Sequence, residues 1–591
     1  MRSARRLLPI GLASLFLGGV GVADAAQGFH GRILDAQGKA VSGAVVSARN
    51  AALARTTTVY ADEEGRYRLP DLVDGPYDVR ARHFGFKDRM KMAVPADGRQ
   101  LDLRLAPESD DYDRMAALPS NRWFALALAA MPNAHMREEF ERQCTFCHQQ
   151  GSWPTRVERT PEQWEKIFSL MARMGAMLSP DTRKALPTVL NAAYDHNTAV
   201  QKLKEQLERD ALPTGAGLPA VIDEWEIGTR ASFQHDVVVH PAGLIYAVDM
   251  TQDALNQLDP RTGARKAFKI PDAGLPPAGV FEGVLLPPPN ANMHVGPHSL
   301  QVAPDGKIWV TLPIGNKIGI FDPRTETWNV VDQANGLYPH TLRFDAKGRA
   351  WYTLAGSNQV GMIDPKTFEQ RTIRLPARTY AQAFASRFAL FLIRSARWFG
   401  SPETVSEDFM GPVPYGIDIG PDGGVWFSQL NLRRIGRIDP DTGTNEIFDT
   451  PFPAPRRLRF DSEGNLWIPG FSAGVIARFN PKTKAFQTWD LPTRPKGSET
   501  PYAVNVDRKT DTVWICGTNS DTLIRFDPKI EKFTVYPMPT RVTYTREIDF
   551  DNEGGVWTSN SNHPGWQIET SSPQIIRLLE NGMPKTEMVK R

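Results

Sequence analysis

The stretch PYGIDIGPDGGVWF, residues 414–427, joins two runs of alternating apolar residues through a Pro-Asp-Gly-Gly turn. Such alternation predicts two short strands, and the Asp-Gly turn predicts that they pair as antiparallel neighbours. Related phrases recur along the chain as QHDVVVHPAGLIYA, PHSLQVAPDGKIWV, PHTLRFDAKGRAWY, PRRLRFDSEGNLWI, PYAVNVDRKTDTVWI and TREIDFDNEGGVWT. Together they form seven repeats, which begin near His235, His298, His340, Tyr415, Arg456, Tyr502 and Arg546.

The spacing of these repeats indicates the fold. A repeat of roughly 42 residues that contains short strands and tight turns is typical of one blade of a β-propeller. The seven repeats therefore predict a seven-bladed β-propeller over residues 222–585. Two intervals are longer than the others, 63 residues from the first repeat to the second and 75 from the third to the fourth. They predict insertions near 271–295 and 375–411.

The first residue of each repeat is expected at one mouth of the central channel, because the first strand of a blade lines that channel. This position holds His235, His298, His340, Tyr415, Arg456 or Arg457, Tyr502 and Arg546. Packing alone would favour small apolar residues, so the set predicts a ligand or catalytic site at a solvated mouth. A His or Tyr would act as general base, and the arginines would hold an anionic or carbonyl group. A polar channel without a ligand is the alternative, and Glu282, His294 and His563 near Trp566 are further candidates.

The repeats resemble those of the streptogramin (virginiamycin B) lyase family over about 230–580, most closely in PYGIDIGPDGGVWFSQLNLRRIGRID. The resemblance implies a C–O elimination that opens a cyclic peptide ester, with His298 or His340 at the position of the base. The metal-binding glutamates of that family are not matched, because the corresponding positions hold Leu312, Leu354, Gln429, Gly470, Gly517 and Asn560. A hard divalent cation would therefore lack its usual oxygen ligands. The resemblance supports the fold more than the lyase activity, and whether another divalent metal binds is left open.

A second motif, QCTFCHQQG at 143–151, contains Cys144, Cys147 and His148, and Cys516 is the only other cysteine in the chain. Three cysteines provide no disulfide framework, and Cys516 is expected as a buried thiol in a blade strand. A zinc site would need more cysteine or histidine ligands, and a redox dithiol would need an α/β setting. Two thiols followed by a histidine are the elements that attach one covalent haem c, with His148 as proximal iron ligand.

The pattern around this motif is helical over 123–212, after an acidic linker at 107–122. Residues 123–205 resemble small monohaem cytochrome c domains, in which a Trp-initiated helix carries a methionine ahead of a glycine turn. The resemblance implies Met171, seven residues after Trp164, as the distal haem ligand. Alternatives are Met174, Met177, a histidine such as His196, or methionines that only fill the core. A methionine ligand would raise the reduction potential and suit an electron acceptor.

The N-terminal part of the chain predicts export and a small β-sandwich. The basic MRSARRLL, the apolar LLPIGLASLFLGGVGV and the small residues ADA predict a signal peptide over 1–25 and a periplasmic location. Residues 27–106 alternate between turn signals. The phrases GRILDAQGKAVSGAVV, DEEGRYRLPDL and GPYDVRA resemble the carboxypeptidase regulatory-like family, a transthyretin-shaped module. That resemblance implies an adhesive or spacing role.

Charge and patterning also bear on partners. The formal net charge is only +2 and no Lys/Arg tract occurs, so nucleic acid is not an expected partner. The segment 377–399, ARTYAQAFASRFALFLIRSARWF, lacks acidic residues and predicts an amphipathic helix. Its expected apolar face contains Phe384, Phe388, Phe391, Leu392 and Phe399. Contact with a membrane surface is one interpretation. We favour the other, in which the helix packs against the propeller rim or the helical domain.

The haem motif decides between the function classes, because elimination moves no electrons and oxidation does. We expect a periplasmic oxidoreductase whose propeller binds a small organic substrate and whose cytochrome domain accepts electrons and passes them to a periplasmic redox partner. A non-catalytic electron-transfer or sensing protein, with the propeller as docking platform, is the first alternative. A streptogramin lyase-like C–O lyase is the second.

Replacing both Cys144 and Cys147 by Ala should abolish covalent haem attachment, because both thioether bonds would be lost. After acid-acetone extraction, the pellet of the wild-type protein should keep its haem absorbance and that of the double variant should not. Colour retained in the variant's pellet would contradict the assignment.

Overall fold

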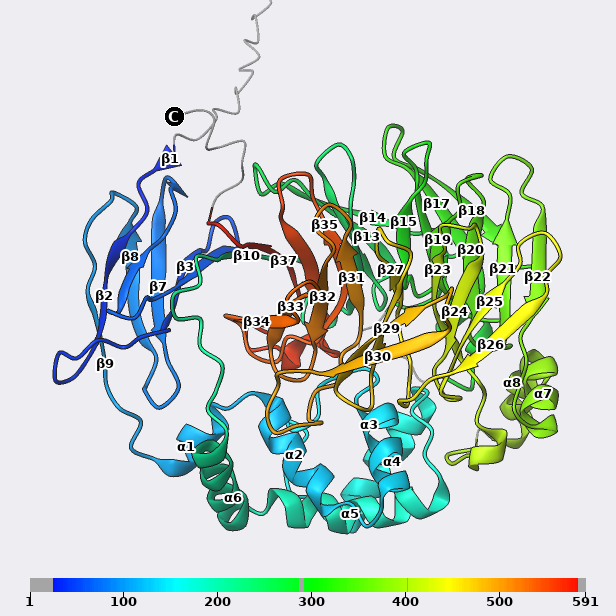
Figure 1. The fold of residues 1–591 in the computed structure, drawn as a ribbon, viewed down its shortest axis with the longest axis horizontal. Coiled ribbons are helices and arrows are strands. Elements are labelled where there is room, and N and C mark those ends of the chain that lie inside the picture. The colour runs from blue at the N-terminus through cyan, green and yellow to red at the C-terminus, as the bar shows by residue number, and fades with distance from the viewer. Residues whose placement is uncertain (1–24, 286–291, 401, 583–591) are drawn as a thin grey trace, which may run out of the picture.

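The computed structural model describes residues 25–285, 292–400 and 402–582 of the chain. Nearly all of the predicted signal peptide (1–25) lies outside this part, as does the end of the predicted propeller range. The described chain is mostly β, with an N-terminal sandwich, a layer of helices and a C-terminal propeller (Figure 1). The sandwich and the propeller confirm the corresponding predictions.

The N-terminal sandwich packs two sheets around a buried apolar core that includes Phe29, Ile33, Val46 and Val79. Strand β2 pairs with β5 and, in parallel, with β9, while β3 pairs with β4 and β7. The strands are β1 (Ala25–Ala26), β2 (His30–Asp35), β3 (Val45–Asn50), β4 (Arg55–Tyr60), β5 (Arg66–Arg68), β6 (Leu72–Val73), β7 (Pro76–Arg82), β8 (Arg89–Pro95) and β9 (Leu103–Leu105).

Six helices form a layer along one face of the propeller (Figure 1). They are α1 (Asp111–Ala116), α2 (Ser120–Ala130), α3 (Ala134–Cys144), α4 (Pro161–Arg173), α5 (Pro180–Tyr194) and α6 (His196–Arg209). The expected linker at 107–122 contains α1 and the start of α2. Its acidic residues serve the helix, because the carboxylate of Asp110 accepts a hydrogen bond from the amide of Asp113 at 2.9 Å and caps α1.

The propeller has seven four-stranded antiparallel blades within the described residues. Six of them are separate sheets, and the seventh is part of a larger sheet. Blades 1 to 3 are β11 (Gln234–Val239), β12 (Ile245–Asp249), β13 (Ala254–Leu258) and β14 (Arg265–Lys269); β15 (Leu300–Val302), β16 (Ile308–Leu312), β17 (Lys317–Asp322) and β18 (Thr327–Asp332); β19 (Pro339–Phe344), β20 (Ala350–Leu354), β21 (Gln359–Ile363) and β22 (Gln370–Arg374). Short 3-10 helices occur at Gly279–Phe281, Glu407–Phe409 and Gly565–Gln567.

The remaining blades follow the same order. Blades 4 to 6 are β23 (Pro414–Ile419), β24 (Val425–Gln429), β25 (Arg434–Ile438) and β26 (Asn445–Asp449); β27 (Arg459–Phe460), β28 (Leu466–Gly470), β29 (Val475–Asn480) and β30 (Ala485–Asp490); β31 (Val504–Asp507), β32 (Thr512–Gly517), β33 (Thr522–Asp527) and β34 (Lys532–Pro537). Blade 7 combines β35 (Thr545–Phe550), β36 (Val556–Asn560) and β37 (Gln574–Leu579) with β10 (Val221–Glu226), which precedes blade 1.

The repeated tryptophan explains why successive blades pack. In blades 2 to 7 the second strand carries a buried tryptophan, namely Trp309, Trp351, Trp426, Trp467, Trp514 and Trp557. Trp351 packs into the apolar cluster of the following blade, against Ile417 and Val425. Its indole N–H donates to the carboxylate of Asp345 at 2.9 Å, and that carboxylate also accepts the amide of Arg349 within the turn. One aspartate thus fixes both the turn and the tryptophan.

Strand β10 ties the two β domains together. It pairs with β37 on one edge and with β4 of the sandwich on the other, so an eight-stranded sheet runs through both domains. The buried carboxylate of Asp223 in β10 accepts hydrogen bonds from Thr57, Arg55 and Arg577. These partners outweigh burial and hold the pKa of Asp223 well below its usual range.

The insertion predicted at 375–411 forms α7 (Tyr380–Arg387) and α8 (Ala389–Phe399), which break at Phe388 instead of forming one helix. The predicted buried thiol is confirmed, since Cys516 in β32 has no exposed surface.

Asp223→Asn should destabilise the sandwich and propeller together, by about 3–5 kcal/mol, because buried guanidinium groups lose a charged partner. Thermal unfolding should show one lowered transition. The wild-type protein should lose this contribution as pH falls from about 4 through the depressed folded pKa, since only the folded carboxylate resists protonation. Glu226→Gln, at a more exposed pair with Arg49, is the control and should change stability by less than about 1 kcal/mol. Equal effects of the two substitutions would contradict this role of β10.

Candidate functional site

The Cys-x-x-Cys-His segment, residues 144–150, lies between the helical layer and one mouth of the propeller. Helix α3 ends at Cys144, and the following turn contacts blades 6 and 7. The guanidinium of Arg546 donates to the carbonyl of Cys147 at 2.8 Å, and the hydroxyl of Tyr544 donates to the carbonyl of Phe146 at 3.0 Å. The amide of Gln149 donates to the side chain of Asn562 at 3.0 Å. The propeller therefore holds the backbone of this segment directly.

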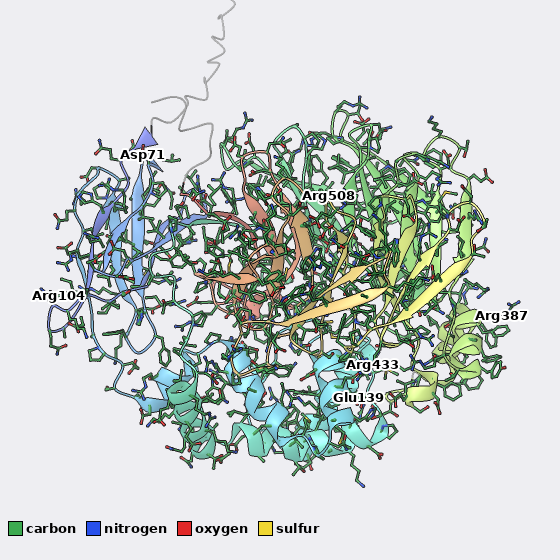
Figure 2. All side chains as sticks on the ribbon, in the orientation of Figure 1. Asp71, Arg104, Glu139, Arg387, Arg433 and Arg508 are labelled. Atoms are coloured by element: carbon green, nitrogen blue, oxygen red, sulfur yellow. The ribbon has the colours of Figure 1, made fainter. Side chains whose placement is uncertain are left out.

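Neighbouring contacts fix the rest of the layer on the same face. The backbone amide and side chain of Asn121 bond to Asn519 and Ser498 of the propeller. Arg433 of blade 4 forms an ion pair with Glu138 of α3. Figure 2 shows Arg433 on the propeller side of this boundary and Glu139 on the helical side.

The seven residues predicted from the repeats lie together at this mouth; we call them the mouth ring. Its members are His235, His298, His340, Tyr415, Arg456, Tyr502 and Arg546. Ring centroids are 3.6 Å apart between His235 and His298, 4.0 Å between His298 and His340, and 4.1 Å between His340 and Tyr415. The first strands of the blades contact one another around the channel, from β11 through to β35 and back to β11. This arrangement explains why equivalent repeat positions converge.

The mouth ring is buried, whereas a solvated mouth was expected. Each of its seven side chains is at most 4% exposed. Phe146 from the Cys-x-x-Cys-His segment covers it, with its ring 6.1 Å from that of Tyr415 and 5.0 Å from the guanidinium carbon of Arg456. No pattern in the sequence relates residue 146 to the repeats.

A cluster of buried charged residues that were not all predicted lies next to the mouth ring. Arg457 pairs with Asp236 at 2.8 Å and with Glu547, and Arg459 pairs with Glu547 at 2.8 Å. Sequence reasoning missed Asp236 and Glu547. Both directly follow a mouth-ring residue, as Arg457 does, so the same repeat alignment extended by one position would have found this ion cluster.

Burial lowers the pKa of His235, His298 and His340 well below the usual range, and nearby arginines lower it further. The three imidazoles are therefore neutral at pH 7, beside permanently charged guanidinium groups. Within the described residues, several of their polar atoms have no hydrogen-bond partner: Nδ1 of His298, Nε2 of His340, Nε and Nη1 of Arg456, and Nε and Nη2 of Arg457. Such buried, unsatisfied nitrogens favour a small anionic group or water as partner.

Two tyrosines connect these groups. The hydroxyls of Tyr415 and Tyr502 are hydrogen-bonded to each other, and the Tyr502 hydroxyl lies 3.4 Å from Nε2 of His235. Burial alone would raise the pKa of Tyr502, but Arg546, Arg456 and Arg457 outweigh it and the pKa is lowered. Burial keeps the pKa of Tyr415 well above its usual range. The pair can therefore share and transfer a proton.

Two thiols and an imidazole are the donor set that covalent haem attachment would require, and the structure shows what surrounds each of them. Nδ1 of His148 lies 3.1 Å from the carbonyl of Gln149 and 3.4 Å from the side-chain amide nitrogen of Gln150, and the shorter contact favours Nδ1 as a donor with Nε2 as the ligand atom. No group of three or more His, Cys, Asp or Glu side chains in the described residues could hold a metal ion. Cys144 contacts the helical core, whereas Cys147 lies near Arg546 and Arg456.

The distal candidates are less closely defined. Met171 is in the last turn of α4, Met174 caps this helix and Met177 follows it, all partly accessible. His196 at the start of α6 stacks on Tyr112 with ring centroids 4.2 Å apart, which is a packing role. The described contacts do not join any of these four side chains to His148.

Of the remaining candidate site residues, His563 lies beside the mouth ring, whereas His294 and Glu282 lie in the first insertion. His563 stacks on Phe233 at 4.4 Å, beside the mouth ring, and burial, His148 and Arg546 lower its pKa to about 3. His294 bonds within the first insertion, to the carbonyl of Leu275 and the side chain of Asn292, and Glu282 ends a 3-10 helix there. The six positions that lack glutamate are buried strand ends, where Gln429 and Asn560 bond to neighbouring amides.

Comparisons with known proteins identify one domain and give several solved structures with partial similarity. Residues 28–106 match the carboxypeptidase regulatory-like domain, which confirms that prediction. A streptogramin B lyase structure has 18% identity and a TM-score of 0.47, covering 61% of this chain and 97% of its own. Virginiamycin B lyase from Staphylococcus aureus has 17% identity and a TM-score of 0.45 over 61% and 99%. Kuenenia stuttgartiensis hydrazine synthase has 12% identity and a TM-score of 0.42, covering 60% of this chain and 97% of its own. No curated protein sequence matches the chain.

Acidification should destabilise the protein through the mouth-ring histidines. Their folded pKa lies below the unfolded value of about 6.5, so only the unfolded chain gains protons and stability is lost as pH falls below about 6.5. His298→Asn should therefore show a shallower fall in melting temperature than the wild type between about pH 7 and 5.

This comparison separates the histidine from buried carboxylates such as Asp549, whose raised pKa of about 6 gives the opposite slope. His135→Asn is the control, because His135 is half exposed, and should follow the wild-type slope. A His298→Asn slope identical to that of the wild type would contradict a neutral buried His298.

Proposed function

We propose that the protein is a haem c oxidoreductase in which the propeller mouth binds a small organic anion and the helical layer carries the electron acceptor. One observation supports this most directly. The guanidinium of Arg546 donates to the carbonyl of Cys147 and lies 3.4 Å from Nε2 of His235. A single side chain therefore connects the proposed haem-attachment segment to the mouth ring.

Haem would be held by thioether bonds to Cys144 and Cys147, with Nε2 of His148 and Met171 as the proposed iron ligands. Bound there, it would accept electrons one at a time. This assigns 123–212 to a cytochrome c-like domain and 107–122 to a connection that includes α1. Export by residues 1–25 to the periplasm, where haem c and a soluble redox partner would be available, belongs to the same proposal.

The residues of the mouth ring would bind and deprotonate the substrate. Arg456 and Arg457 have unsatisfied N–H groups for a carboxylate or carbonyl oxygen. His298 and His340 are neutral, so either can accept a proton, and the Tyr415–Tyr502 pair can pass it onward through His235. Phe146 excludes bulk water from this side of the ring, which strengthens these polar interactions.

A second candidate is an electron-transfer or sensing protein without catalysis, with the propeller as docking platform. The observation in its favour is the close packing of the mouth ring, whose side chains fill the mouth beneath Phe146. The lyase alternative has less support, since leucine, glycine, glutamine and asparagine occupy the positions of its carboxylate ligands.

His298→Ala and His340→Ala should each reduce substrate-driven haem reduction by at least about 100-fold, the lower end of what a positioned base contributes. Purified protein would be mixed with classes of small organic anions while haem absorbance is followed, with haem content and folding checked for each variant. His135→Ala should behave as the wild type, and a chelator should have little effect. Full activity in both variants, or reduction only by another redox protein, would favour the docking alternative. Complete loss with chelator that magnesium restores would favour the lyase-like metal mechanism.

A further inference from the structure

Helices α7 and α8, here called the aromatic helix pair, expose an unusual amount of apolar surface. Exposed fractions are 97% for Tyr380, 58% for Phe384, 68% for Phe391, 84% for Trp398 and 89% for Phe399. Of the seventeen large apolar side chains that are exposed in the described chain, seven lie in these two helices and an eighth, Phe388, lies between them. Scattered apolar residues are ordinary on a protein surface, but such a concentration marks an interaction site.

The aromatic helix pair has no apolar core beneath it. Among its described side chains only Gln382 is buried, and the capping hydroxyl of Thr379 bonds to the carbonyl of Asp408. The helices have eight and eleven residues, a length that is marginal in water unless an apolar face is covered. The segment contacts the propeller rim through the guanidinium of Arg378, and closer packing of the helices there stays a prediction. The exposed aromatic side chains are available to a partner outside this chain.

The charge of the segment specifies that partner. Residues 377–399 contain arginines but no Asp or Glu. Arg378 bonds to blade 4, while Arg387 and Arg394 are exposed beside the aromatic side chains. Figure 2 shows Arg387 at the outer edge of the molecule. Exposed aromatic residues next to cationic ones suit the headgroup region of an anionic lipid surface. No helix of the described chain is long and apolar enough to span a bilayer.

We propose that the aromatic helix pair binds the surface of an anionic lipid bilayer and inserts Phe391, Trp398 and Phe399 at the headgroup boundary. Contacts between the segment 375–411 and the helical layer also fix the orientation of the bound protein. Glu403, just after α8, pairs with Arg183 of α5, and Met410 contacts Arg142 of α3. Figure 1 shows α7 and α8 on the side of the propeller that carries the helical layer. Binding would therefore hold that layer close to the lipid. This proposal does not depend on the proposed redox function.

Vesicle sedimentation with the full-length protein tests it. Vesicles of phosphatidylcholine with phosphatidylglycerol should bind the protein, and added salt should weaken binding by screening the arginines. The triple variant Phe391→Ser, Trp398→Ser, Phe399→Ser should bind at least about tenfold more weakly, since most of the inserted apolar area is lost. Arg387→Gln with Arg394→Gln should remove most of the preference for phosphatidylglycerol over phosphatidylcholine alone.

The control variant is Met92→Ser with Ile530→Ser, because these side chains are similarly exposed at 65% and 67% but lie elsewhere. It should bind vesicles as the wild type does. Absence of wild-type binding to the anionic vesicles at low salt, or equal binding by the triple variant, would overturn the proposal. Self-association that the triple variant abolishes, without vesicle binding, would replace the lipid by a second copy of the chain.

Discussion

The pairing of β10 on both of its edges is the interaction on which the rest of the structure depends. A propeller needs its last blade completed, and here the missing fourth strand comes from the segment before blade 1. The same strand continues the sheet into the sandwich through β4. The carboxylate of Asp223 in β10 binds Arg55 of β4 and Arg577 of β37, so ion pairs reinforce the backbone pairing between the sandwich and blade 7. Closure keeps the seven first strands in a circle, and the mouth ring exists only while that circle is closed.

The helical layer depends in turn on the closed propeller. Its Cys-x-x-Cys-His segment has little regular structure of its own after α3, and its backbone is held by side chains of blades 6 and 7. The carboxylate of Asp521 illustrates this coupling, because it accepts hydrogen bonds from the side chain of Gln149 and from the backbone of Thr543. The turn that carries the cysteines therefore forms against a surface made by distant parts of the chain.

The features that could be predicted from the sequence are those that repeat in every blade. The Asp-Gly turn and the tryptophan recur because every blade solves the same packing problem, so both the blade count and the seven mouth residues could be read from one alignment. Features that occur only once in the chain could not be predicted in this way. Nothing periodic marks Phe146 as a cover, so a buried ring was mistaken for a solvated one. The acidic stretch before α2 predicts a linker, whereas in the structure Asp110 caps helix α1. The single predicted helix at 377–399 is two, since local apolar spacing does not report the break at Phe388.

The continuous sheet through β4, β10 and β37 also bears on solubility. A strand edge that loses its neighbour offers a row of unpaired amides and carbonyls to any other chain. If β4 were removed, the edge of β10 would lie open, with the apolar residues Ile222 and Trp225 in the same strand. The sandwich thus acts as an edge cover for blade 7. By covering this edge, the sandwich would prevent intermolecular strand addition and the aggregation that follows from it, without any need to bind a ligand.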